Sequence, residues 1–197
     1  MKVFLTVFVC VFVLGCALAD LEFVQTTRYA AIDSSCSNSP LSINAQLSGA
    51  TIYESTYTCT PDGTTVEINA NETLAALTTG QCLTFEGYYA RFDCVAQPIK
   101  LKNYLLLLEY SDCWVSPDNL VKYSLEATNQ CISNPSNPSS YAYMSCSFTN
   151  SVEYIFDASL PANSSDSYCP GALIGKRVNT WTENQCVGGF AQVYDCL

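Results

Sequence analysis

The chain has 197 residues, of which 12 are cysteines and none is histidine, and its formal charge is −10 at pH 7. The absence of histidine excludes imidazole-based triads and zinc sites with histidine ligands. The low number of lysines and arginines argues against a nucleic-acid partner, because phosphates are neutralised by basic side chains. Cysteine at this density predicts a disulfide framework made in an oxidising compartment.

Residues 1–19 have the pattern of a secretory signal peptide. Lys2 supplies the positive start, residues 3–14 form the apolar stretch, and Ala17-Leu18-Ala19 forms a small-residue cleavage site. Cleavage after Ala19 removes two cysteines and leaves ten, an even number that disulfides can use completely. The sequence therefore predicts a secreted, extracellular protein.

The rest of the chain divides into four related units, each with a glutamine, a cysteine, a loop and a strand that ends in cysteine. They are Gln46-Leu47 to Cys59, Gln81-Cys82 to Cys94, Gln130-Cys131 to Cys146 and Gln185-Cys186 to Cys196, with Leu47 in place of the first cysteine in one unit. The units group in pairs, so we expect two similar halves, 20–106 and 107–197, which stand in tandem or merge into one domain.

The cysteines of these units suggest a disulfide pattern. Cys36, Cys113 and Cys169 precede three units, whereas the second unit has no leading cysteine. The first unit likewise lacks a cysteine, at Leu47. If the two missing cysteines would have bonded to each other, their counterparts in the second half, Cys131 and Cys169, are expected to form a disulfide. The simplest pairing of the others is Cys36–Cys59, Cys82–Cys94, Cys113–Cys146 and Cys186–Cys196. Each set of four still leaves three connectivities open.

Between the cysteines, short β-branched and aromatic runs follow turn signals and predict strands. In chain order these runs are 64–68, 104–108, 119–123, 151–156 and 177–181. Only residues 72–77 have the pattern of a helical turn, and no longer helical periodicity is present. We therefore predict an all-β fold of short, disulfide-stapled strands in two tandem, similar halves, arranged as a β-sandwich or barrel-like structure.

Two Asn-x-Ser/Thr sequons, at Asn71 and Asn163, predict glycosylation of a secreted chain. The strongest apolar run after the signal segment, residues 104–108, is too short to cross a membrane, so no membrane span is expected.

No catalytic, cofactor-binding or metal-binding pattern is present. The chain contains no Gly-x-Ser-x-Gly elbow, no Cys-x-x-Cys pair and no calcium-binding loop. Catalysis by carboxylates alone would need two of them about 5–10 Å apart in a concave pocket. We therefore predict a non-enzymatic protein without cofactors.

Aromatic residues expected on outward strand faces or near a turn form the candidate binding surface: Tyr89, Trp114, Tyr141 and Tyr143. The favoured function is an extracellular binding or recognition module for a protein or a carbohydrate. One alternative is a structural component of an extracellular matrix or coat. Another is a protease inhibitor or other secreted enzyme-related protein, with residues 132–139 and 171–176 as candidate inhibitory loops.

Overall fold

The computed structural model describes residues 23–52, 54–70, 73–85, 87–97, 99–134, 137–162, 168–182 and 185–197. The expected signal peptide and both sequon asparagines lie outside these residues. The described chain is all-β with no α-helix, which confirms the predicted fold class. All five predicted strand segments overlap observed strands. The segment proposed as a helical turn is wrong, because its described part belongs to strand β6.

The described residues of the first half form eight strands. They are β1 (Phe23–Ala30), β2 (Ser42–Leu47), β3 (Thr51–Ile52), β4 (Ser55–Cys59), β5 (Thr65–Ala70), β6 (Thr73–Thr78), β7 (Cys82–Phe85) and β8 (Tyr88–Val95).

The second half repeats this order. Its strands are β9 (Tyr104–Tyr110), β10 (Leu120–Ala127), β11 (Cys131–Asn134), β12 (Asn137–Ser147), β13 (Asn150–Asp157), β14 (Ala172–Thr180), β15 (Gln185–Val187) and β16 (Phe190–Cys196). A 3-10 turn, Pro117–Asn119, precedes β10. The expected boundary at 106/107 falls within β9.

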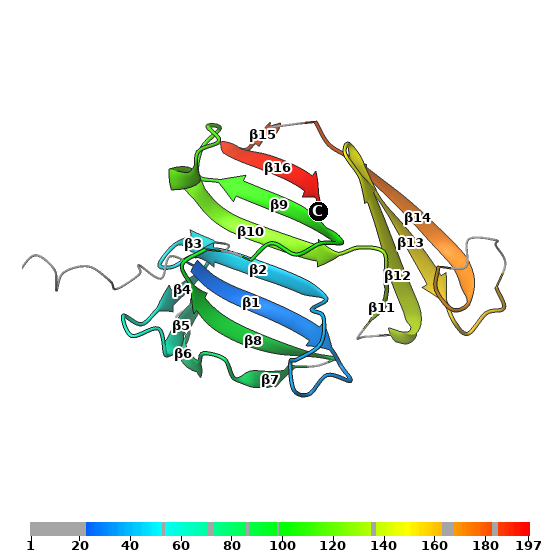
Figure 1. The fold of residues 1–197 in the computed structure, drawn as a ribbon, viewed down its shortest axis with the longest axis horizontal. Helices are drawn as coiled ribbons and strands as arrows, with labels where there is room; N and C mark the ends of the chain where they lie inside the picture. The colour runs from blue at the N-terminus through cyan, green and yellow to red at the C-terminus, as the bar shows by residue number, and fades with distance from the viewer. Residues whose placement is uncertain are drawn as a thin grey trace, which may run out of the picture.

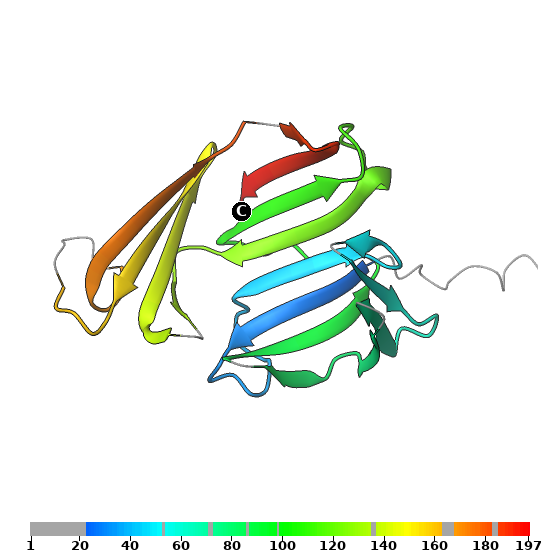
Figure 2. The same ribbon diagram turned by 180° about the vertical axis from the view of Figure 1, so that it is seen from behind.

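The two halves share one large antiparallel sheet with the order β15-β16-β9-β10-β2-β1-β8-β7. Each half also builds a smaller four-stranded sheet, β3-β4-β5-β6 or β11-β12-β13-β14. Figures 1 and 2 show these smaller sheets at opposite ends of the large one. The central strands β2 and β10 pair antiparallel, with Asn44 opposite Ser124, so an approximate two-fold axis relates the halves.

The described residues form five disulfides, four of which follow the same symmetry. Their pairs are Cys36–Cys82 and Cys59–Cys94 in the first half, and Cys113–Cys186, Cys131–Cys169 and Cys146–Cys196 in the second. The predicted Cys131–Cys169 bond is confirmed, and none of these five bonds joins the two halves. The other four predicted pairings are wrong. Each of them joined two cysteines of the same unit, whereas each observed bond joins cysteines of two different units.

Strand registers also correct the alignment of the first unit. In β3–β4, Thr51 lies opposite Thr56, three residues before Cys59. In β11–β12, Cys131 lies opposite Tyr143, three residues before Cys146. The counterpart of Cys131 is therefore Thr51 and not Leu47, which ends the central strand β2.

Strand alternation gives the large sheet two distinct faces. The first, here called the core face, carries the main hydrophobic cluster of both halves: Phe23, Ile43, Ala45, Tyr104, Leu106, Tyr123, Leu125 and Ala127. The tyrosine hydroxyls on this face donate to backbone carbonyls in neighbouring loops, Tyr104 to Pro40 and Tyr123 to Ile99.

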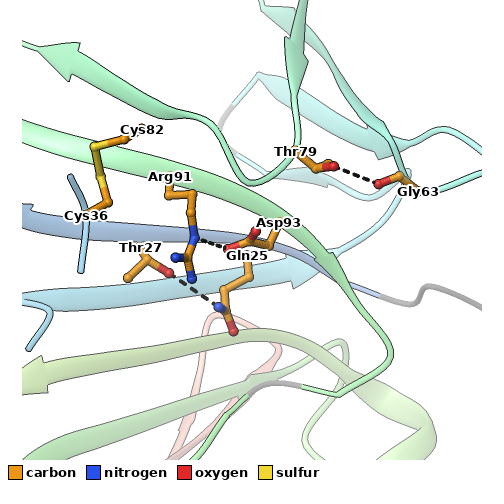
Figure 3. A network of polar contacts seen from close by, with 8 residues as sticks. All are labelled: Gln25, Thr27, Cys36, Gly63, Thr79, Cys82, Arg91 and Asp93. Atoms are coloured by element: carbon orange, nitrogen blue, oxygen red, sulfur yellow. Dashed lines mark hydrogen bonds and ion pairs between the residues drawn. A yellow bond between two sulfur atoms is a disulfide. The ribbon is translucent and has the colours of Figure 1, made fainter. Parts of the chain in front are cut away.

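In the first half, the same face also carries a group of polar side chains beside the Cys36–Cys82 disulfide (Figure 3). Gln25 Nε2 donates to Thr27 Oγ1 at 3.3 Å, and Arg91 Nε contacts Asp93 Oδ2 at 2.8 Å. Gln25 is only 3% exposed, and its Oε1 has no hydrogen-bond partner within the described residues. This group makes the core face more polar in the first half than in the second.

Candidate functional site: a groove across the large sheet

The second face of the large sheet, here called the groove face, forms the floor of three cavities. The first has a volume of about 700 Å³ and lies mainly against the first half, whereas the second, of about 610 Å³, lies mainly against the second half. Asn44, Lys122 and Glu126 line both cavities. We call the combined space the groove, since these shared residues join the cavities across the middle of the sheet.

The strands of the floor supply its side chains in cross-strand rows. The central row reads Phe92, Thr26, Asn44, Ser124, Leu107 and Tyr194, from β8 to β16. The row is symmetric in position: Phe92 and Tyr194 each stand two residues before the last cysteine of their half. Ser124 Oγ donates to Asn44 Oδ1 at 2.9 Å at its centre. The floor is therefore aromatic at both ends and polar in the middle.

The small sheets form the walls of the groove. In the first half, Tyr57, Ile68 and Leu77 pack against Val24 and Ala90, both 1% exposed, and against Phe92. In the second half, Trp181 stacks on Tyr194 with ring centroids 5.0 Å apart. The Trp181 ring nitrogen donates to the Phe148 carbonyl at 3.0 Å, which fixes the indole in place. The Cys59–Cys94 and Cys146–Cys196 disulfides tie the two walls covalently to β8 and β16.

Charged residues flank the central row. One neighbouring row runs from Arg28 through Ser42 to Glu126, and the other from Gln46 through Lys122 to Glu109. Lys122 Nζ forms an ion pair with Glu109 Oε1 at 3.2 Å. Arg28 and Glu126 stand two strands apart, a backbone separation of about 10 Å, and they form no ion pair with each other within the described residues.

Gln46 also lacks a partner. Its Nε2 atom is buried at the floor of the first cavity and has no hydrogen-bond acceptor within the described residues. A buried donor without an acceptor costs free energy, so such a group is commonly hydrogen-bonded to water or to a ligand oxygen.

A third cavity, of about 260 Å³, opens beside the first and is lined by Arg28, Tyr88, Glu126 and Glu153 among others. Glu126 is exposed to solvent, yet desolvation by the groove walls raises the pKa of its carboxyl, and the like charge of Glu153 raises it further. Glu153 is already engaged, since its Oε2 lies 3.6 Å from Arg177 Nη1.

The four predicted binding residues are distributed over separate surfaces, and none of them lines the three cavities. Tyr89 is half-buried and points to the core face of β8, opposite Tyr29. Trp114 is 75% exposed in the loop between β9 and β10. Tyr141 and Tyr143 share the outer face of β12, the face of the small sheet turned away from the groove.

Tyr143 belongs to an aromatic cluster on that outer face. Its ring stacks on Tyr168 at 4.4 Å between centroids and lies 6.3 Å from Tyr154. The Cys131–Cys169 disulfide holds the Tyr168 segment over the sheet. This packing gives Tyr143 a structural role in the second half.

The candidate inhibitory loops are also corrected. Residues 172–176 belong to β14, a regular strand paired with β13, and do not form a loop. The described part of 132–139 belongs to the β11–β12 hairpin. The described residues therefore contain no extended loop at 171–176.

Sequence reasoning missed the groove residues, although a signal was present. Ser42, Asn44 and Gln46 alternate with core residues on β2, and Lys122, Ser124 and Glu126 do so on β10. Polar residues at every second position are common on any solvated strand. Only the pairing of these two strands across the halves brings the two polar sets together.

No protein-family model, no curated protein and no solved structure matches this chain. Within the described residues, no helix is long and apolar enough to span a bilayer. The same residues contain no group of three or more Cys, Asp or Glu side chains placed to hold a metal ion.

Proposed function

We propose that this chain is a secreted, non-enzymatic glycoprotein that binds an extracellular protein or carbohydrate in the groove. The observation that carries the proposal is the pair of cavities of about 700 and 610 Å³, which meet at Asn44, Lys122 and Glu126. Binding sites are commonly concave, apolar at the walls and supplied with a few polar groups, and this groove has that composition.

The proposed compartment rests on the covalent structure. Five disulfides are typical of proteins that mature in an oxidising environment and act outside the cell. The signal-peptide pattern of residues 1–19 and the sequons at Asn71 and Asn163 support the same destination.

The groove favours recognition through side chains. Its floor consists of strands in the middle of a sheet, whose backbone groups are used in pairing on both sides. A ligand therefore cannot bind by adding a strand there, and contacts must come from amides, hydroxyls, charges and aromatic rings.

Filling the groove tests the proposal. Thr26→Trp places an indole on the central row of the floor, and we expect it to abolish binding to ligands found on a glycan array or by pull-down from extracellular material. Thr84→Trp is the matched control, because Thr84 is exposed on β7 and points to the opposite face. Equal capture by the wild type and Thr26→Trp would contradict a ligand site in the groove and would favour a structural role.

Hydrolysis of a bound glycoside is a second candidate, which one observation favours. Glu126 and Glu153 line the same small cavity, and the pKa of Glu126 is raised, as suits a general acid. Glu126→Gln should abolish the release of reducing ends from bound saccharide if this candidate holds. Release that is absent in the wild type, with binding retained, supports the non-enzymatic function.

A further inference from the structure

We infer that the ligand of the groove is a saccharide that carries a carboxylate, and that Arg28 binds this carboxylate. The inference rests on the proposed function and specifies its ligand class. It follows from the environment of Arg28, from the unused donors on the floor and from the charge of the surrounding protein.

Arg28 is the groove cation without a carboxylate partner. Arg91, Lys122 and Arg177 each form an ion pair, whereas Arg28 forms none within the described residues. Its side chain is exposed and lines both the first and the third cavity. An exposed guanidinium without an ion pair offers parallel N–H donors, which match the two oxygens of a carboxylate.

Aromatic stacking holds this guanidinium in position before a ligand arrives. The Arg28 Cζ lies 4.9 Å from the centroid of the Tyr88 ring. The Phe85 ring stacks on Tyr88 with centroids 5.2 Å apart and planes 7° apart. Because β8 lies between β1 and β7, Arg28 and Phe85 approach Tyr88 from opposite sides. A guanidinium carbon over a ring face makes a cation–π contact, which uses none of the N–H donors of the group.

The neighbouring groups fit a sugar ring better than a peptide. Gln46 offers a buried Nε2 donor without an acceptor, and the Asn44–Ser124 pair offers an amide and a hydroxyl beside it. Phe85 is 38% exposed at the mouth of the first cavity and can pack against the apolar face of a sugar. The hydroxyl groups of a sugar can hydrogen-bond to such dispersed donors and acceptors. An extended peptide would instead need an unpaired strand edge for its backbone.

The charge of the protein limits how acidic this saccharide can be. The chain has a formal charge of −10, and Glu126 and Glu153 line the cavity that Arg28 also lines. A densely sulfated or highly carboxylated polymer would be repelled. A saccharide with one carboxylate, or with widely spaced carboxylates, can place one on Arg28 and direct neutral hydroxyls towards Glu126.

The experiment is calorimetric titration of the full secreted protein with defined probes. The probes are sialyllactose and a hyaluronan tetrasaccharide, each compared with its carboxyl-reduced form. A galacturonate tetramer, with a carboxylate on every residue, is the densely charged probe and should bind more weakly than these two. Arg28→Gln removes the charge, and Arg28→Lys keeps the charge but removes the planar fork. Lys100→Gln is the matched control, since Lys100 is exposed in the segment that crosses the core face. The disulfide map and thermal unfolding confirm that each variant is folded.

We expect at least one carboxylated probe to bind and its reduced form to bind about 10-fold more weakly or worse. Arg28→Gln should weaken binding of that probe at least about 10-fold, because a hydrogen-bonded charge pair is lost. Arg28→Lys should recover only part of this loss, and Lys100→Gln should change nothing.

Other outcomes separate the ligand class from the site. Equal binding of the reduced probes, unchanged by Arg28→Gln but abolished by Thr26→Trp, overturns the carboxylate anchor and leaves the groove as the binding site. Binding of no saccharide, with capture of a protein that Thr26→Trp abolishes, overturns the saccharide class in the same way. Binding of any ligand that Thr26→Trp does not alter overturns both proposals.

Discussion

The two halves of the molecule have the same strand order and equivalent disulfides, yet their side chains differ in kind at matching positions. On the core face, Gln25 lies opposite Asp93 in the first half, where Leu106 lies opposite Asp195 in the second. The second half buries a leucine where the first buries an amide. The strand order and two of the disulfides are thus common to both halves, while the core chemistry is not.

The groove face differs in charge at matching positions. Arg28 lies opposite Ala90, four residues before Cys94, and Glu109 lies opposite Gln192, four residues before Cys196. A cation in one half therefore corresponds to an anion in the other. The groove is therefore related by the two-fold axis in its strand arrangement but not in its charge.

The small sheets differ in size as well. The turn from β5 to β6 is short in the first half, whereas β13 and β14 are separated by residues 158–171, which include Cys169. The Cys131–Cys169 bond and the stacked Tyr168 belong to this longer connection. Two disulfides therefore have counterparts in both halves. The remaining one, Cys131–Cys169, belongs to the longer connection of the second half.

The largest effect is expected from making the second half resemble the first at the core face. Leu106→Gln buries a polar side chain where Leu106 is 3% exposed among other apolar residues. We expect a loss of about 3–5 kcal/mol in the free energy of unfolding, from lost apolar burial and an unsatisfied amide. Urea unfolding measures the change.

The reciprocal variant, Gln25→Leu, controls for side-chain size. It removes a buried Oε1 without a partner at the loss of one 3.3 Å hydrogen bond, so stability should change by less than about 1 kcal/mol. Equal destabilisation by both variants would show that the two positions have the same environment after all.

Removal of a bridge common to both halves should come next. Cys59→Ser with Cys94→Ser frees the wall of the groove from β8, and a bond that closes a loop of this length stabilises by about 2–4 kcal/mol. Unfolding of the secreted double variant in urea tests the size of the loss. We also expect weaker ligand binding, because the wall is no longer held against Phe92.

The bridge confined to the second half should matter less. Cys131→Ser with Cys169→Ser opens a loop of similar length, 38 residues against 35, so chain entropy alone predicts an equal loss. We expect only about 1–2 kcal/mol, because the segment next to Cys169 can detach locally while the rest of the sheet remains folded. Urea unfolding gives the loss, and hydrogen exchange should show faster opening of that segment alone.

The smallest effect concerns the groove carboxyl. The raised pKa of Glu126 means that the folded state favours the protonated form, so wild-type stability falls as pH rises through that pKa. Glu126→Gln should therefore be more stable than the wild type at pH 7, by under about 1 kcal/mol because the side chain is exposed to screening solvent. The advantage should disappear below about pH 4.5, the ordinary pKa of a glutamate.

Glu67→Gln is the matched control for this measurement, because Glu67 is an exposed carboxyl on β5 outside the groove. A pH-dependent gain of the same size in this variant would attribute the effect to net charge rather than to the groove.

The fold class, the duplication and one disulfide could be predicted from the sequence because they depend on local patterns and on counting. The spacing from a preceding glutamine makes Leu47 the counterpart of Cys131, whereas the strand register makes Thr51 the counterpart of Cys131. The remaining disulfides depend on which hairpins stack together across the sheet. Such long-range pairing leaves no trace in the spacing of neighbouring cysteines.

The candidate site was missed for a related physical reason. Tyr143 and Trp114 are predicted as binding residues because they are aromatic, but aromatic character does not reveal which sheet face is concave. Asn44 and Ser124 are ordinary polar strand residues until β2 and β10 pair. The groove is thus a property of the assembled halves, and no segment of the sequence contains it alone.

The antiparallel pairing of β2 with β10 about the Asn44–Ser124 position has the geometry of an isologous interface between identical subunits. A single half, expressed alone, would present β2 as an open edge ready to pair with another copy of itself. The chain therefore has the strand arrangement of a homodimer whose two subunits are joined in one polypeptide. Because each half has its own sequence, Arg28 and Glu109 can differ at matching positions, which no homodimer of identical chains permits.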